Sequence, residues 1–195
     1  MSHPKPDARF AKKTLPKVAC PGPWFRIHRS NNGAVFFGTT GLHRFDAPNK
    51  EYGVLYAAAE SHGAFIETFG HATGAHPVTE AEIDDRRLST LKTTRSLQLV
   101  DLAGEGLAKI GADASLTSGN IGDSLVHEWS KAIYDHPQTP DGILYRARHD
   151  PSTLAAAIFE RAASAIATDS THSLLDPPHV SLLASILERY DFALI

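Results

Sequence analysis

The stretch YGVLYAAAESHGAFIETFG, residues 52–70, predicts a strand that leads directly into a helix. Its first part, residues 53–58, is a short apolar run of the kind that forms a buried strand. The second part, residues 59–69, has apolar residues at helical spacing, among them Ala64, Phe65 and Phe69. Gly70 is well suited to end this helix.

On both sides of this stretch, short extended runs alternate irregularly with helical ones. We expect strands at residues 24–28, 34–37, 97–99, 142–148 and 192–195. We expect helices after a capping box at Thr79–Glu82, at residues 121–136, after Asp150-Pro151 and after Pro177-Pro178. Because the order lacks strict βαβ alternation, a single α+β domain is favoured over a doubly wound α/β fold.

Four of these segments also predict which residues share a face. The strand at 24–28 places Phe25 and Ile27 on one face and Trp24, Arg26 and His28 on the other. The helix at 121–136 carries an apolar stripe of Ile121, Leu125, Trp129, Ala132 and Ile133. The helix after Asp150 places on neighbouring turns Leu154, Ala157, Ile158 and Arg161. The last helix directs inward Val180, Leu183 and Leu187.

Composition indicates one soluble globular domain, which we place at residues 21–195. The chain has 195 residues, of which 42% are hydrophobic and 21% charged, and a net charge of -3. This charge argues against a dedicated nucleic-acid binder. Cys20 is the single cysteine and cannot form an internal disulfide, which favours a reducing, cytoplasmic compartment. The longest apolar runs are far shorter than a membrane span, and no signal peptide is predicted.

The charge is distributed unevenly along the chain. Residues 1–20 contain five Lys and Arg residues against Asp7 alone, a net charge of +4, so residues 21–195 carry -7. With three prolines as well, this segment is expected to be a basic, weakly ordered N-terminal arm. Such an arm is either a solvated tail or a docking segment for a partner.

The common nucleotide and metal motifs do not occur in this sequence. It has neither a G-x-x-x-x-G-K-[ST] phosphate loop nor a G-x-G-x-x-G fingerprint. It has eleven histidines but no H-x-x-x-H or H-E-x-x-H pair, so we expect no metal site. Cys20 lies between flexible prolines without a helix N-terminus to activate it, which argues against a cysteine nucleophile.

Four polar residues interrupt apolar segments of the predicted strands and helix: Arg26, Arg44, Tyr56 and Glu67. A buried charge is costly unless it is paired, so these residues need a structural or functional reason. One interpretation is an internal Arg26–Glu67 ion pair, with Tyr56 as an ordinary strand aromatic. The other is a functional site.

Five segments in order resemble the RES domain: WFRIHR, HRFD, YGVLYAA, AFIE and DGILYRARHD. The resemblance covers about residues 22–165. It implies an ADP-ribosyltransferase-like fold, with a mixed or antiparallel sheet core and surrounding helices. It also implies an NAD-consuming toxin that an Xre-type DNA-binding antitoxin neutralises. NAD is then the substrate; no direct contact with nucleic acid or membrane is implied, and a homodimer within the toxin–antitoxin complex is compatible with it.

The resemblance assigns roles to individual residues. It gives a catalytic role to Glu67, Arg26 and Tyr56. It places at the NAD site Arg26, Arg44, Tyr56 and Ala147. This chain departs from the family pattern at three positions, with His43 in place of glycine, Asp46 in place of asparagine and Ala147 in place of the family's serine. Three explanations compete for Ala147: compensation by Ser118 or Ser124, loss of activity, or a substitution introduced to make a toxic protein producible.

The chemistry of NAD cleavage suits these residues. Nicotinamide leaves as a neutral molecule and needs no general acid, so one carboxylate suffices where glycosidases commonly use two. Glu67 is the candidate to stabilise the oxocarbenium-like transition state. The guanidinium groups of Arg26 and Arg44 suit a pyrophosphate, and Tyr56 suits stacking on the nicotinamide ring.

Three functions therefore remain after the sequence has been considered. The leading one is an NAD-degrading toxin that transfers ADP-ribose to water or phosphate. The second is a protein ADP-ribosyltransferase toxin. The third is a catalytically inactive RES-like module that binds NAD or a partner, which Ala147 motivates.

Overall fold

The computed structural model describes residues 5–71, 77–119 and 123–195. Its strands are β1 (Lys17–Cys20), β2 (Trp24–Arg29), β3 (Val54–Ala58), β4 (Pro77–Val78), β5 (Arg86–Thr93), β6 (Leu97–Asp101), β7 (Gly142–Arg146), β8 (Leu154–Phe159), β9 (Ile166–His172) and β10 (Ala193–Leu194). Its α-helices are α1 (Ser61–Phe69), α2 (Glu80–Asp84), α3 (Gly106–Ile110), α4 (Ser115–Ser118), α5 (Asp123–Tyr134) and α6 (Val180–Tyr190). Short 3₁₀ helices lie at Phe10–Lys12, Glu160–Ala165 and Pro177–His179.

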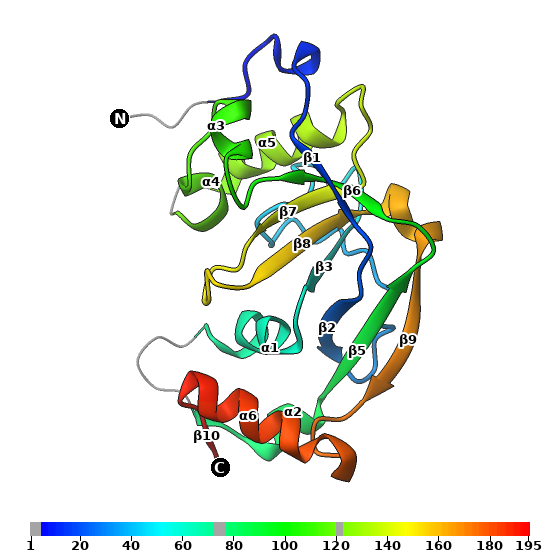
Figure 1. Ribbon diagram of the computed structural model, residues 1–195, viewed down its shortest axis with the longest axis vertical. Coiled ribbons are helices and arrows are strands. Elements are labelled where there is room, and N and C mark those ends of the chain that lie inside the picture. The colour runs from blue at the N-terminus through cyan, green and yellow to red at the C-terminus, as the bar shows by residue number, and fades with distance from the viewer. Residues whose placement is uncertain (1–4, 72–76, 120–122) are drawn as a thin grey trace.

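A curled mixed sheet forms the centre of the domain (Figure 1). In the described residues it has eight strands in the order β1-β6-β7-β8-β3-β2-β5-β9. Neighbouring strands are antiparallel, except that β6 and β7 are parallel. A separate pair, β4 and β10, is parallel. The strands and helices share one domain without strict βαβ alternation, which confirms the α+β prediction.

The helices divide into two groups around this sheet (Figure 1). Helices α3, α4 and α5 lie beside β6 and β7, and α6 and α2 lie at the opposite end. Helix α1 lies between the two groups and packs against β2 and β3. No described helix is long and apolar enough to cross a bilayer.

The strand–helix unit predicted at residues 53–69 is confirmed, because β3 leads into α1. Gly70 is the C-cap of α1, and its N–H donates to the Ile66 carbonyl at 2.8 Å. Strand β3 pairs with β8 on one side and β2 on the other, and its apolar side chains are buried, as expected of a central strand.

Other predicted elements are also present. The capping box predicted at Thr79 is present at the start of α2. The Thr79 side chain accepts from the Glu82 backbone N–H, and the Glu82 side chain accepts from the Thr79 backbone N–H. Strands β2, β6, β7 and β10 and helices α5 and α6 fall in predicted segments. Ile121 of the predicted helical stripe lies outside the described residues. In α6 Leu183 is buried, but Val180 is half exposed because it is the first residue of the helix.

Two predicted elements are wrong. The segment after Asp150 is the strand β8 instead of a helix, because its run LAAAIF pairs with both β3 and β7. In this strand, an Ala-rich sequence fits either element and the sheet decides between them. Residues 34–37 form a loop instead of a strand, and only Gly38 makes an isolated bridge, to Val54.

The basic N-terminal segment does not behave as a weakly ordered arm over residues 5–20. Lys17–Cys20 is the edge strand β1, paired with β6. Phe10 and Leu15 are buried in the core, where the Phe10 ring meets Trp129 edge to face at 5.4 Å. These two apolar residues anchor a segment whose charge suggested a solvated tail.

Several partly buried histidines, of which His28 and His172 are two, predict that the fold loses stability in acid. Burial lowers the pKa of His28, whose ring bonds to Ser89 Oγ and the Arg29 carbonyl. Burial and His179, stacked on it at 3.5 Å, lower the pKa of His172. The unfolded chain therefore binds more protons below about pH 6.5, so stability is complete above that pH and falls below it.

We expect the midpoint of thermal unfolding to fall by a few degrees between about pH 7 and pH 5. Replacing His172 with glutamine should flatten this fall, because glutamine does not titrate. A midpoint that stays constant over this range, or a variant as acid-sensitive as the original chain, would contradict the assignment.

Candidate functional site

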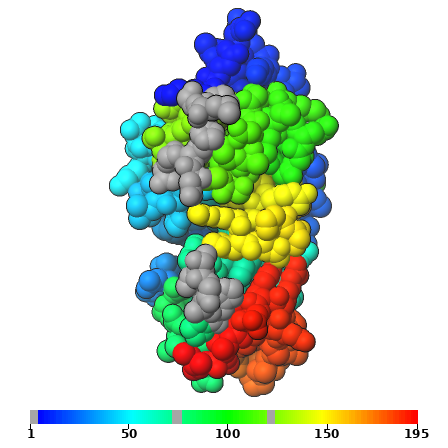
Figure 2. Space-filling model, turned by 90° about the vertical axis from the view of Figure 1, so that its left-hand side faces the viewer, coloured from blue at the N-terminus to red at the C-terminus, as the bar shows by residue number. Residues whose placement is uncertain are grey.

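A cavity of about 490 Å³ opens beside α1. Its walls come from β2, β3, α1, the loop before Phe45, α4 and the turn between β7 and β8. Figure 2 shows the face that is hollowed here, below the loop around residue 45 and the turn after β7. The volume is within the usual range for small-molecule sites. The cavity brings together Arg26, Arg44, Tyr56 and Glu67, which the sequence spreads over 42 positions.

Glu67 faces the cavity because α1 packs closely on Ala58 at the end of β3 and on Thr153 just before β8. A Cβ added at Gly63, one turn earlier, would lie 3.2 Å from Thr153 Oγ1, so a larger residue would push the helix outward. The His149 N–H donates to Glu67 Oε1 at 3.0 Å. Within the described part of the chain, the other oxygen, Oε2, has no hydrogen-bond partner. One carboxylate oxygen is thus fixed and the other is open to a ligand.

Arg26 does not pair with Glu67. Its Nη1 donates to the carbonyls of Ala34 at 2.7 Å and Phe36 at 3.2 Å, so it holds the loop that was predicted as a strand. The structure describes both Arg26 and Glu67, and no ion pair joins them. The interpretation of an internal ion pair is therefore wrong.

The Arg26 guanidinium is charged at neutral pH although it is partly buried. Burial lowers its pKa to about 10, which still leaves it protonated. Nη2 and Nε have no partner among the described residues, so part of the planar fork is available to an anion.

Tyr56 presents its ring to the cavity and its hydroxyl to the protein. The hydroxyl donates to Asp46 Oδ1 and accepts from the Phe45 N–H, both at 2.9 Å. Burial and the Asp46 carboxylate raise the pKa of Tyr56. The His43 ring lies 5.3 Å from the Tyr56 ring, tilted by 55°. The hydroxyl bonds hold the ring in the cavity wall, where an aromatic side chain is suited to stack on a planar ligand.

Asp46 organises the loop that carries His43 and Arg44. It is 1% exposed, and its Oδ2 accepts from the Thr40 hydroxyl and from three consecutive backbone N–H groups, those of Gly41, Leu42 and His43. With Tyr56 on Oδ1, this one carboxylate joins the loop to β3. The sequence marks Asp46 only as a departure from a family pattern.

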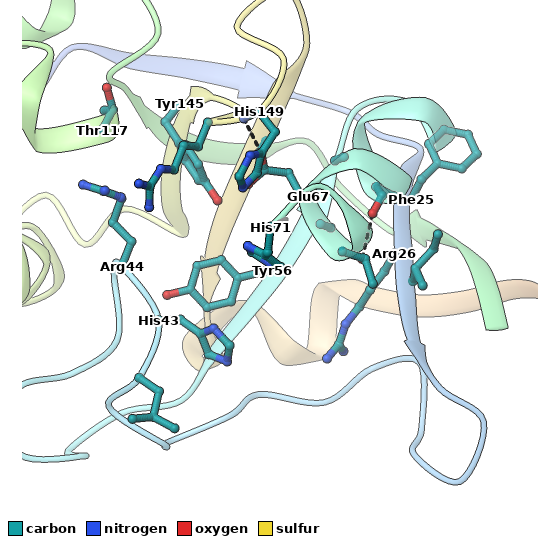
Figure 3. A pocket seen from close by; sticks show the side chains of 18 residues that line it. Phe25, Arg26, His43, Arg44, Tyr56, Glu67, His71, Thr117, Tyr145 and His149 are labelled. Carbon is teal, nitrogen blue, oxygen red and sulfur yellow. Dashed lines mark hydrogen bonds between the residues drawn. The ribbon is translucent and has the colours of Figure 1, made fainter. Parts of the chain in front are cut away.

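Arg44 joins the same loop to α4. Its Nη1 donates to the Leu116 carbonyl at 3.1 Å and its Nη2 to the Gly119 carbonyl at 3.0 Å. Figure 3 shows Arg44 and Arg26 on opposite sides of the view, with Tyr56, Tyr145 and Glu67 between them. The predicted residues therefore surround the cavity instead of forming one cluster.

Further lining residues were not singled out from the sequence. They include Tyr145 on β7, Thr117 on α4, the exposed His71 and Arg148, and the partly exposed His149. The His71 and His149 rings meet edge to face at 5.1 Å. Among the described lining residues, three arginines face one carboxylate, so the cavity is positive within a chain that is negative overall. An anionic ligand fits this charge.

Ala147 does not line the cavity. It is 1% exposed, packs in the core beside Tyr145, and its N–H donates to the Thr153 carbonyl at 3.1 Å. Neither serine considered as its substitute lines the cavity. Ser118 Oγ donates to the Ala114 carbonyl at 3.1 Å, and Ser124 is exposed on α5.

The described residues contain neither a cluster of metal ligands nor a cysteine in the cavity. No three His, Cys, Asp or Glu side chains among them come together as a metal site would require. Cys20 lies on β1, away from the cavity, and burial raises the pKa of its thiol.

The chain is similar to known proteins in sequence and in fold. The sequence model of the RES domain family matches residues 23–182. A Sinorhizobium fredii (strain NBRC 101917 / NGR234) protein described as "Probable toxin y4kH" is 30% identical over 105 residues, which are 53% of this chain and 80% of that protein. A chain in the crystal structure of the M. tuberculosis MbcT-MbcA toxin-antitoxin complex is 14% identical, with a TM-score of 0.66. The match covers 91% of this chain and 98% of that chain, and at this identity it shows the fold alone.

Proposed function

This chain belongs to the RES domain family, and from that premise we propose that it is the toxin of a toxin–antitoxin system and cleaves the nicotinamide–ribose bond of NAD. The observation that carries the proposal is the isolated carboxylate of Glu67, with one oxygen held by His149 N–H and the other open, in a cavity lined by three arginines. The relative in Sinorhizobium fredii is described as a probable toxin, which supports the toxin part of the proposal.

The charges in the cavity suit NAD. Arg26 has guanidinium N–H groups left for the pyrophosphate, and Arg44 lies across the cavity from it. The face of Tyr56 is suited to the nicotinamide ring. Such a contact would hold the glycosidic bond in a reactive orientation.

Glu67 would then act on the ribose. As nicotinamide leaves, positive charge develops on the ribose ring, and a carboxylate beside it stabilises that charge more than it stabilises the bound substrate. The leaving group takes the electrons of the broken bond and becomes neutral, so the cavity needs no second carboxylate. A water molecule, which gives up one proton to the solvent, or an oxygen of phosphate then forms the new bond to the ribose carbon and completes the transfer.

Free nicotinamide, followed by chromatography after purified protein is mixed with NAD, tests the proposal. Parallel reactions with and without phosphate distinguish ADP-ribose from its 1″-phosphate as the product. A third reaction with labelled NAD and cell extract reports transfer to protein. If no nicotinamide appears under any of these conditions, the catalytic proposal fails.

An antitoxin partner also belongs to this proposal. Leu42 lines the cavity and is 84% exposed, and Phe36, whose carbonyl holds Arg26, is also exposed. Large apolar side chains beside a cavity are suited to a protein that covers it. We expect such a partner to be an Xre-type DNA-binding protein encoded next to this chain, and co-purification of the two would test it.

A catalytically inactive module is the second candidate, because Ala147 replaces the family's serine. If the chain is active, Ala147→Ser should change the rate of nicotinamide release only modestly, since position 147 lies outside the cavity. Tight NAD binding without turnover, in both the original chain and this variant, would favour the inactive module instead.

A further inference from the structure

The cavity contains four side-chain hydroxyls in its described lining, and three of them already donate their proton to the protein. Tyr56 donates to Asp46 Oδ1, Thr68 to the Ala64 carbonyl and Thr117 to the Ala114 carbonyl. The fourth, on Tyr145, has no hydrogen-bond partner among the described residues. Tyr145 is thus the cavity's free hydroxyl donor.

Tyr145 is held so that its hydroxyl meets the cavity. The residue is 7% exposed, and its ring packs against Phe45 with centroids 5.0 Å apart. Figure 3 shows the hydroxyl turned into the space between Arg44 and Glu67. Burial and the Glu67 carboxylate raise the pKa of Tyr145, so the hydroxyl keeps its proton across the neutral range.

The Tyr145 hydroxyl contributes no hydrogen bond to the fold within the described residues, and it is not among their solvent-inaccessible, unpaired polar atoms because it opens onto the cavity. Replacing such a group with an apolar one of the same shape is close to neutral or stabilising, whereas losing a satisfied hydroxyl is destabilising. A tyrosine at this position is therefore better explained by a ligand than by the fold.

We propose that the Tyr145 hydroxyl and the open oxygen of Glu67 together bind one hydroxyl of the ligand's ribose. This inference rests on the proposed function and deepens it. The protonated Tyr145 hydroxyl has a hydrogen to donate, whereas the Glu67 carboxylate can only accept, so a group that accepts from Tyr145 and donates to Glu67 satisfies both. A ribose hydroxyl does both. Tyr145 lies two residues before Ala147 in the chain. Its hydroxyl would therefore supply a ribose contact near a position where this chain has no serine hydroxyl.

The test compares Tyr145→Phe with Tyr134→Phe. The Tyr134 hydroxyl also lacks a hydrogen-bond partner in the described residues, but Tyr134 stacks on Tyr52 and does not line the cavity. Tyr134→Phe therefore removes an unpaired hydroxyl away from the proposed ligand site. Affinity for ADP-ribose, measured by calorimetry, should fall about tenfold in Tyr145→Phe and stay unchanged in Tyr134→Phe. The unfolding midpoint of ligand-free Tyr145→Phe should not fall, as it would for a structural hydroxyl.

NAD analogues that lack one hydroxyl of the nicotinamide ribose identify the contact. The effect of Tyr145→Phe on kcat/KM should disappear with the analogue that lacks the bound hydroxyl and persist with the other. If the original chain cleaves NAD but Tyr145→Phe matches Tyr134→Phe, or loses the same activity with both analogues, the inference is wrong and the proposed function stands. If the original chain neither cleaves NAD nor binds ADP-ribose, both are wrong.

Discussion

Replacing Glu67 with glutamine is expected to lower the rate of nicotinamide release about a thousandfold while leaving the fold intact. Glutamine keeps a carbonyl oxygen that accepts the His149 N–H, so the contact that orients the side chain survives. It removes the negative charge that would stabilise the ribose as positive charge develops on it. The effect should therefore fall mainly on kcat, with little change in KM.

Glu60→Gln is the matched control for this prediction. Glu60 precedes α1 and is exposed, and it lies outside the cavity. Its contact with Arg189 spans 3.7 Å at the surface, where an ion pair contributes little. Initial rates of nicotinamide release should be normal in this variant, and both variants should unfold at nearly the temperature of the original chain. A Glu67→Gln variant that retains full activity would remove Glu67 from the mechanism.

The fold could be predicted from sequence where local and long-range preferences agree. The strand at 53–58 and the helix after it have the apolar spacing that their places in the sheet and core require. The run at 154–159 has no such agreement, because alanine suits a helix and only pairing with β3 and β7 makes it a strand. Phe10 and Leu15 are the reverse case, since two buried side chains outweigh a basic, proline-containing segment.

The site was predictable as a set of residues but not as an arrangement. Unpaired polar residues in apolar segments identified Arg26, Arg44, Tyr56 and Glu67, all of which line the cavity. Their partners were hidden, because Glu67 is held by a backbone N–H 82 positions away and Arg44 by carbonyls more than 70 positions away. Backbone groups leave no trace in a sequence, so the sequence suggested Arg26 as a partner for Glu67 instead.

Tyr145 could not be identified as a site residue from the sequence, because its place in the strand is also typical of a core residue. In GILYRAR, Tyr145 shares one face of the predicted strand with the apolar residue Ile143. A tyrosine in that place is easily taken for a core residue. Only the hydrogen bonds of the neighbouring hydroxyls distinguish it from Tyr56, whose proton is already used.

Replacing Asp46 with alanine is expected to lower the free energy of unfolding by about 3 kcal/mol, or the midpoint by about 10 °C. The change removes the acceptor for the hydroxyls of Thr40 and Tyr56 and for three backbone N–H groups. Some of these donors will reach water, because Leu42 is exposed, but Asp46 itself lies in the interior. Unpaired buried donors account for most of the cost.

Asp46→Asn separates the hydrogen bonds from the charge. An asparagine keeps one oxygen for the backbone N–H groups and can turn its NH₂ to the Tyr56 hydroxyl, which then acts as an acceptor. We therefore expect it to cost about a third as much as alanine, in line with the asparagine that the family pattern has at this position. Thermal unfolding of both variants measures the difference. Because the same carboxylate orients Tyr56 and the loop of Arg44, nicotinamide release should fall in the same order, with alanine lowest. Equal unfolding midpoints for the two variants would mean that solvent replaces the Asp46 acceptors and that the loop is held by Arg44 and α4 instead.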